Sequence, residues 1–204
     1  MSGAIEQVLA LVPPVRGQDC VRVGIDGVDG AGKTTFAREL AAALRRQGRP
    51  VVQVSVDDFH RPRAVRHARG RHSPEGFWLD SFDYARLVAD VLEPLGPGGS
   101  REFRPASHCL GTDRMLEPPP QRAAPGSVLV VDGVFLHRDE LVQHWDFSVF
   151  LEVPFAVSVA RMAARDGTSA DPGDPGNLRY VRGQQLYFAA CEPWLRASLV
   201  IVHS

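Results

Sequence analysis

Apolar residues along this chain follow two kinds of pattern that take turns: short runs typical of strands, and longer segments with the period of a helix. Short apolar runs that are typical of buried strands occupy Val21–Ile25, Val51–Val56, Val128–Val131, Phe147–Val153 and Ser198–Val202. Between these runs, apolar residues recur every three or four positions, as in a helix that covers a core. Strands that alternate with helices form parallel sheets through right-handed crossovers. The pattern therefore predicts an α/β fold with three layers, α/β/α, around a five-stranded parallel sheet.

Helical periodicity predicts where the covering helices lie. Their apolar positions fall at Ile5–Val12, Phe36–Leu44, Tyr84–Leu95, Val159–Ala163 and Leu178–Leu186. We expect Pro154 to open one of these helices and Asn177 to cap the last one. The stretches at about 60–80 and 96–122 have neither period and are basic or rich in proline, with room for a short hairpin. We interpret them as insertions on the substrate side of the fold.

A glycine-rich loop, Gly27–Thr34, joins the first predicted strand to a helix with the spacing Gly-x-x-x-x-Gly-Lys-Thr. The backbone N–H groups of such a loop bind phosphate, the lysine reaches the outer phosphates, and the threonine hydroxyl ligates magnesium. The spacing therefore predicts a nucleoside triphosphate site with Mg²⁺, as in a P-loop NTPase. Its predicted contacts are Gly27, Asp29, Gly30, Ala31, Gly32, Lys33, Thr34 and Thr35.

Two other predicted strands end in acidic residues. Asp57-Asp58 follow the second strand, and Asp132 ends the third. Ligands of open parallel sheets collect at the carboxyl ends of the strands, so we expect the loop and these acids at one edge. There, Asp57 is predicted to accept a proton from an acceptor hydroxyl, and Asp57 and Asp132 to join Thr34 around magnesium. The competing interpretation is that each acid only caps a helix or faces solvent.

Composition and charge narrow the class of partner. The 204 residues fit one domain, predicted to span 1–204, and a net charge of −1 gives no general attraction to nucleic acid or membranes. Cys20, Cys109 and Cys191 lack Cys-x-x-Cys spacing, which argues against a zinc site or a disulfide framework. No long apolar span or signal-peptide pattern occurs in the sequence. We therefore expect a cytoplasmic protein whose partners are small molecules.

Two groups of arginines are candidates for binding phosphate. The segment His60–His72 is either a mobile solvated loop or a cationic flap over phosphorylated reactants, with Arg61 and Arg63 nearest Asp57 in the sequence. Nucleic-acid binding is less favoured, because this segment lacks interleaved aromatic residues. Arg161 and Arg165 precede a segment rich in glycine and proline, and they are predicted to belong to a lid at about 166–177 that closes over ATP. Surface ion pairing is the alternative for Arg161 and Arg165.

Taken together, these motifs resemble the uridine kinase branch of the phosphoribulokinase and uridine kinase family of P-loop kinases. Besides the glycine-rich loop, the resemblance rests on Asp57–His60, Asp80–Asp83, Asp132–Val134 and Arg161–Asp166. It implies an ATP-dependent kinase that phosphorylates the 5′-hydroxyl of uridine or cytidine in nucleoside salvage, and relatives of this kind often form homo-oligomers. By resemblance, Asp57 is the catalytic base, Asp132 the second acid, and Lys33, Arg161 and Arg165 complete the catalytic set.

The acceptor is the least specified part of the prediction. Candidate acceptor contacts are Asp58, His60, Arg61, Arg63, Trp78, His108, Arg179 and Gln184, although aromatic and histidine residues near loops are often partly core. His60 stands where these kinases carry a tyrosine, Ala106–Cys109 replaces a Tyr-Asp-Phe run, and the lid segment Asp171–Asp174 replaces a basic one. The acceptor is therefore a pyrimidine nucleoside or another hydroxylated metabolite, as in pantothenate-, glycerate- or phosphoribulose-type relatives.

Two other classes of function stay open. The loop Asp29–Thr34 also resembles that of nucleoside monophosphate kinases such as thymidylate kinase, but these enzymes carry Arg-Glu-Pro where this chain has Asp57-Asp58. A nucleotide-gated switch protein is the non-enzymatic alternative. No Asn-Lys-x-Asp stretch that reads guanine occurs in the sequence, which argues against a GTPase switch.

Overall fold

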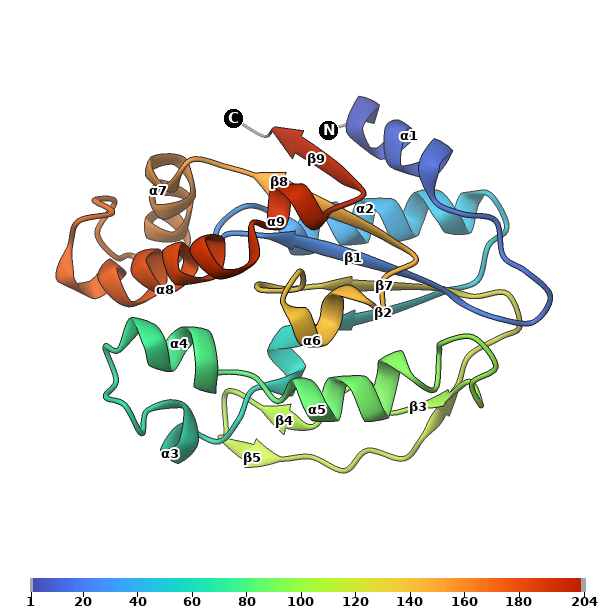
Figure 1. Ribbon diagram of the computed structural model, residues 1–204, viewed down its shortest axis with the longest axis horizontal. Coiled ribbons are helices and arrows are strands. Elements are labelled where there is room, and N and C mark those ends of the chain that lie inside the picture. Colours follow the sequence, from blue (N-terminus) through green and yellow to red (C-terminus); the bar gives the residue numbers. More distant parts are fainter. Residues whose placement is uncertain (1, 203–204) are drawn as a thin grey trace.

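The computed structural model describes residues 2–202 and contains a five-stranded parallel sheet (Figure 1). The strands lie in the order β2-β7-β1-β8-β9, and every neighbouring pair is parallel. Their bounds are β1 Val21–Gly27, β2 Val51–Ser55, β7 Val128–Asp132, β8 Phe147–Glu152 and β9 Leu199–Val202. The predicted three-layer α/β fold with five parallel strands is confirmed.

The sheet is buried on both faces, which explains why its strands read as continuous apolar runs. On β7, Val128 and Val130 join a core formed with α1 (Ser2–Leu11) and α2 (Lys33–Arg46). Leu129 and Val131 of the same strand join a second core on the other face, built largely from the segments that precede and follow β7. Alternate side chains of one strand thus hold the two outer layers to the sheet.

Most of the predicted helices are present, with changes at their ends. The helix predicted from the stripe at 84–95 is α5 (Tyr84–Leu87) followed by a π-helical turn, Val88–Leu92. Pro154 directly precedes α7 (Phe155–Asp166), as expected. The prediction that Asn177 caps the next helix, α8 (Pro175–Cys191), is wrong: the cap is Asp174, whose carboxyl accepts the N–H of Gly176. Asn177 instead donates to the carbonyl oxygens of Ser169 and Asp171 and shapes the loop before α8.

Several short helices are too brief to leave a periodic pattern in the sequence. They are α3 (Arg63–Arg66), α4 (Pro74–Asp80), α6 (Asp139–Val142) and α9 (Pro193–Arg196). A start signal for α4 is nevertheless present, because the Ser73 hydroxyl accepts the N–H of Gly76 and Pro74 occupies the first turn. Helix α4 packs against α8, and both lie beyond the carboxyl ends of β1 and β8, at the left in Figure 1.

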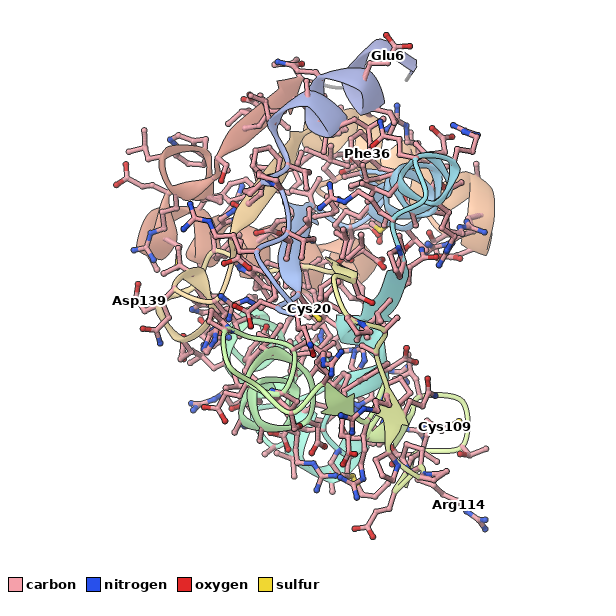
Figure 2. All side chains as sticks on the ribbon, turned by 90° about the vertical axis from the view of Figure 1, so that its right-hand side faces the viewer. Glu6, Cys20, Phe36, Cys109, Arg114 and Asp139 are labelled. Carbon is pink, nitrogen blue, oxygen red and sulfur yellow. The ribbon has the colours of Figure 1, made fainter. Side chains whose placement is uncertain are left out.

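The stretch 96–122 contains two small antiparallel pairs instead of helices. Strand β3 (Glu102–Phe103) pairs with β6 (Gln121–Arg122), and β4 (His108–Cys109) pairs with β5 (Arg114–Met115) in the hairpin expected there. Figure 2 shows Cys109 and Arg114 at the end of the molecule opposite Glu6 of α1. Among residues 2–202, no helix is both long and apolar enough to cross a membrane.

Candidate functional site

The glycine-rich loop follows directly from β1 and packs against α7. Gly30 has φ +76°, and a Cβ at this position would lie 2.3 Å from the carbonyl oxygen of Ser158 on α7, so only glycine allows this packing. Gly32, with φ +89°, precedes α2, and among the described residues no side chain caps this helix. The first N–H groups of α2 therefore remain available for an anion. The loop fits the phosphates of a nucleotide.

Lys33 and Thr34 are held at the base of this loop. The Lys33 ammonium group donates to the carbonyl oxygen of Val28 over 2.8 Å and is nearly buried. The Thr34 hydroxyl donates to the Asp132 carboxyl over 2.6 Å. Thr34 and Asp132, two of the three groups that the sequence predicts around magnesium, thus already touch, although they come from segments far apart in the chain. No direct hydrogen bond joins Asp57 to either of them among the described residues.

Asp57 stands just beyond the carboxyl end of its strand. Strands β2 and β7 are in register with Ser55 opposite Asp132, so the residues that follow both strands emerge at the same edge. The Ser55 hydroxyl accepts the N–H of Asp57 and opens the 3₁₀ turn Val56–Phe59. In this turn Asp57 is exposed and lines a cavity together with Asp29 of the glycine-rich loop. The structure therefore brings the loop, Asp57 and Asp132 together, as the strand pattern predicts.

The carboxyl groups at this edge repel one another. Burial raises the pKa of Asp29, Asp58 and Asp132, and the charge of Asp57 raises the pKa of each further. The charge of Lys33 lowers the pKa of Asp29 and Asp132 and opposes part of this rise. A cation bound at this edge would relieve both the burial and the repulsion of these carboxylates, and carboxylate oxygens are ligands that a hard divalent cation prefers.

A magnesium site at Thr34 and Asp132 fits this chemistry. Within residues 2–202, no group of three or more His, Cys, Asp or Glu side chains is arranged as a metal site by itself. Magnesium rarely needs such a group, because it keeps several waters and binds one or two carboxylates together with substrate phosphates. Thr34 and Asp132 lie beside the phosphate-binding loop and would hold the ion there with the nucleotide.

Replacing Asp132 by Asn is expected to stabilise the nucleotide-free protein in a pH-dependent way. Burial raises the pKa of Asp132 in the folded protein, so folding favours the protonated carboxyl group. The stabilisation that this protonated group gives is fully present below the pKa of aspartate in the unfolded chain, about 4. That contribution is lost as pH rises through the folded pKa. Asn keeps an oxygen for the Thr34 hydroxyl but has no charge to bury. Thermal melts should therefore show equal stability near pH 4 and a more stable variant at pH 7.

The control for this prediction is the same pair of melts with ATP and magnesium. The wild-type protein should then gain more in melting temperature than Asp132→Asn, because the carboxylate would contact the cation. A variant that is less stable than the wild type at pH 7 without nucleotide would contradict the proposed repulsion.

A cavity of about 850 Å³ extends from Asp29 and Asp57 into the space between two sets of helices. One wall consists of residues of α3 and α4 and the residues around them, and the other of residues of α7, α8 and the loop between them. Figure 1 shows these helices on the two sides of the carboxyl end of the sheet. The cavity is thus continuous with the edge where the phosphate-binding loop lies, and it is the natural place for a second reactant.

The predicted acceptor contacts divide into two groups. His60, Arg63 and Arg179 line the cavity. Within residues 2–202, the cavity lining does not include the other predicted contacts, which are Asp58, Arg61, Trp78, His108 and Gln184.

Three residues of the second group have clear structural contacts. The Trp78 ring centroid lies 4.4 Å from the Arg138 guanidinium carbon, and Trp78 packs on the core. His108 is buried, and its Nε2 lies 3.2 Å from Asp113, whose carboxyl also accepts the N–H of Arg63. The Gln184 side chain donates to the Asp29 carboxyl over 2.9 Å. Gln184 thus positions the phosphate-binding loop, and His108 positions the start of α3.

The two predicted lid arginines also differ. Arg165 lines the cavity and pairs with Asp166 over 2.7 Å, and its charge lowers the pKa of Asp29. Arg161 lies one helical turn earlier on α7 and, within the described residues, is not part of the cavity lining. Because the Arg165–Asp166 pair is exposed, it is held loosely and can be exchanged for a phosphate contact.

Sequence reasoning did not select several residues of the cavity wall. Arg66, Arg71 and His72 belong to the basic segment, and Ser81 and Tyr180 come from the two helical walls. The basic run itself was the only available signal, because nothing in the sequence separates arginines that face a cavity from those that face solvent. Arg69, for example, pairs with Asp80 and, within residues 2–202, is not part of the cavity lining.

Comparison with known proteins identifies the same family as the motifs do. The model of the Phosphoribulokinase / Uridine kinase family matches residues 22–170. The uridine kinase of Leuconostoc citreum (strain KM20) is 27% identical over 145 residues, which cover 71% of this chain and 67% of that protein. The phosphoribulokinase of Synechocystis sp. is 29% identical over 148 residues, which cover 72% of this chain and 42% of that protein. These matches confirm the resemblance that rests on the loop and the acids at the strand ends.

A solved structure shows that the fold is shared over nearly the whole chain. "Structure of a Possible Uridine Kinase from Bacillus stearothermophilus" superposes with a TM-score of 0.74 at 24% identity, and the match covers 98% of this chain and 96% of that one. At this identity the likeness establishes the architecture and leaves the acceptor open.

Proposed function

Because the chain belongs to the phosphoribulokinase and uridine kinase family, we propose that it transfers the γ-phosphoryl group of ATP to a hydroxyl group of a small molecule. The observation that carries this proposal is the meeting of three features at one sheet edge. The phosphate-binding loop, the exposed carboxyl of Asp57 and the cavity of about 850 Å³ adjoin one another there. Phosphoryl transfer needs reactants held in line and charge neutralised, and this edge offers both.

The loop side of the site binds the phosphoryl donor. Backbone N–H groups at the start of α2 and the Lys33 ammonium group face the β- and γ-phosphates, and Lys33 then exchanges its bond to Val28 for phosphate oxygens. Magnesium, held by Thr34 and Asp132, would neutralise charge on those oxygens. Arg165 reaches the same phosphates from α7 and stabilises the charge that spreads over the transferred group.

Asp57 serves the acceptor side. Its carboxylate accepts the proton of the acceptor hydroxyl as that oxygen bonds to the γ-phosphorus. The bond from the γ-phosphorus to the bridging oxygen breaks, and ADP leaves with the electron pair. Asp57 is suited to this role because it is exposed to the cavity and its backbone is fixed by Ser55.

Several relatives are named uridine kinase, which makes uridine the first acceptor to test. Cytidine, pantothenate, glycerate and sugar phosphates are the alternatives. Purified protein with ATP and magnesium is offered each acceptor, and phosphorylated products are detected by mass spectrometry. Acceptor-dependent ADP and a monophosphorylated product are expected. Slow ATP hydrolysis at the same rate with every acceptor would contradict the proposal and favour a nucleotide switch.

Lys33→Met is expected to weaken ATP binding by about tenfold to 100-fold, because a hydrogen bond to a charged group contributes roughly 1.5–3 kcal/mol. Met retains the apolar stem of Lys33, so the loop should keep its shape. Titration calorimetry with a non-hydrolysable ATP analogue measures the effect. Lys33 is the only lysine in the chain, so Arg38→Met, on an exposed face of α2, is the matched control and should bind normally. Equal affinity of Lys33→Met and wild type would exclude the assigned role.

A further inference from the structure

The cavity beside the phosphate-binding loop carries opposite charges in two regions. Asp29 and Asp57 mark the region next to the loop, where the charges that act on Asp29 are those of Lys33, Asp57 and Arg165. The second region is formed by α3, the segment that follows it and the first turns of α8, and its charged residues are Arg63, Arg66, Arg71 and Arg179. This second set, called here the arginine cluster, has no role in holding ATP in the proposed function.

Arg179 is the most buried member of the arginine cluster. It is 7% exposed, and among residues 2–202 its guanidinium group donates to two neutral oxygens, the Arg71 carbonyl and the Ser81 hydroxyl. Its Nε is buried and has no hydrogen-bond partner among the described residues. Burial lowers the pKa of Arg179, and the charges of Arg66 and Arg71 lower it further. A buried guanidinium without a carboxylate partner is costly, so this one is prepared for an anion.

Arg66 repeats this feature on the opposite wall. Its Nε is also buried without a partner in the part of the chain that the structure describes. Within residues 2–202, its one ion pair is with Asp113 over 3.5 Å, and that carboxyl also contacts His108 and accepts the N–H of Arg63. Arg63 and Arg66 thus share one carboxyl. The acids on the wall formed by α7, α8 and the loop between them are engaged, since Asp166 pairs with Arg165 and Asp174 caps α8.

His67 lies within reach of the charges of the same four arginines. The pKa of His67 is lowered by burial and then by the charges of Arg179, Arg66, Arg71 and Arg63. Four arginines and one shared carboxyl, that of Asp113, thus leave an excess of positive charge at this end of the cavity. Arginine is suited to such a site because its planar fork binds carboxylate or phosphate through two parallel hydrogen bonds.

We propose that the arginine cluster binds an anionic group of the acceptor, so that the acceptor is a hydroxy acid or a phosphorylated alcohol and not an uncharged nucleoside. The proposal rests on the proposed function, which places the acceptor hydroxyl at Asp57. The anion at the cluster and the hydroxyl at Asp57 would hold the acceptor at two points across the cavity. An uncharged nucleoside would leave the buried guanidinium of Arg179 without a counter-charge and the Nε atoms of Arg179 and Arg66 without a partner.

The first test compares acceptors that differ only in charge. The pairs are glycerate with glycerol, glycerol 3-phosphate with glycerol, and pantothenate with its uncharged alcohol, and uridine and cytidine are included. At least a tenfold higher kcat/KM for an anionic member over its neutral partner is expected, and the carboxylate and phosphate pairs distinguish the two kinds of anion. Equal or better turnover of uridine or the neutral members would overturn the proposal while leaving the kinase function intact.

The second test measures anion binding without turnover. Inorganic phosphate is titrated into protein already loaded with a non-hydrolysable ATP analogue and magnesium, so that the phosphate-binding loop is filled. Arg179→Gln should weaken phosphate binding tenfold or more with unchanged affinity for the analogue. Arg71→Gln, at an exposed position that tolerates substitution, should weaken it in the same direction and serves if Arg179→Gln does not fold. Arg69→Gln, in the same segment but paired with Asp80, is the control and should bind as wild type.

The two tests separate the inference from the function on which it rests. Phosphate binding that is absent, or equal in Arg71→Gln, Arg179→Gln and Arg69→Gln, would overturn the role of the cluster even if some acceptor is phosphorylated. If no acceptor in the panel is phosphorylated, the kinase proposal fails on that panel, and the phosphate titration alone decides whether the cluster binds anions.

Discussion

Asp57→Asn is expected to lower kcat by about 10²–10⁴ and to leave ATP affinity nearly unchanged. The amide has the shape of the carboxyl group but cannot accept the proton of the acceptor hydroxyl. Asp57 is exposed and its turn is fixed by Ser55 and the following residues, so the substitution should not disturb the fold. It also removes the charge that raises the pKa of Asp29, Asp58 and Asp132. The affinity for ATP with magnesium should therefore differ from that of the wild type far less than kcat does.

The measurement is initial rates with a saturating acceptor, together with calorimetric titration of an ATP analogue. Asp90→Asn is the matched control, because Asp90 pairs with Arg86 on the helix that follows the insertion and lies away from the cavity lining of the described residues. The control should retain wild-type kcat. An Asp57→Asn enzyme with kcat within about threefold of wild type would show that proton transfer to this carboxyl contributes little, since general-base assistance is worth far more than that.

The strand framework and the phosphate-binding loop were predictable because each rests on local sequence. Apolar runs mark β7 and β8, and the spacing from Gly27 to Thr34 needs only the flanking strand and helix. The meeting of Asp57 with Asp132 followed from one general rule, since both emerge at the carboxyl edge of a parallel sheet. These features are set by neighbours in sequence or by topology alone.

The cavity wall was less predictable because it depends on packing between distant segments. Arg179 of α8 meets the Arg71 carbonyl because α4 packs against α8, and α4 itself is too short for its period to be seen. Trp78 looked like a ring contact for an acceptor, whereas the structure places it against Arg138 and the core. Which face of such a short helix points into a cavity depends on its partner, and the sequence does not contain that information locally.

A buried carboxyl at Asp26 is the clearest feature that the strand pattern hides. It reads as a polar residue at the end of an apolar run, yet the structure places it fully buried beneath the phosphate-binding loop. One carboxyl oxygen accepts the N–H groups of Leu136 and His137, the His137 ring and the Tyr187 hydroxyl, and the other accepts the N–H of Gly27. Asp26 therefore ties β1 to the segment after β7 and to α8, which also carries Arg179 and Gln184.

Asp26→Ala is expected to lower the free energy of unfolding by about 3–5 kcal/mol, because it leaves several buried donors without an acceptor. Tyr187→Phe is the graded control. It removes one donor and leaves the carboxyl its other hydrogen bonds, so a loss of only about 1–2 kcal/mol is expected. Urea denaturation followed by circular dichroism measures both values, and the slopes should match if the folded states are alike.

The two variants together distinguish an anchoring network from ordinary packing. If Asp26 acts through its hydrogen bonds, Asp26→Ala must cost clearly more than Tyr187→Phe, because the first change removes the acceptor of the whole network and the second removes a single hydroxyl. Equal losses would mean that the network contributes little beyond the removed hydroxyl. Tyr187 lies on α8, the helix that also carries Arg179. In Tyr187→Phe this helix should stay in place because α4 packs against it, so the variant should weaken phosphate binding at the arginine cluster by less than Arg179→Gln does.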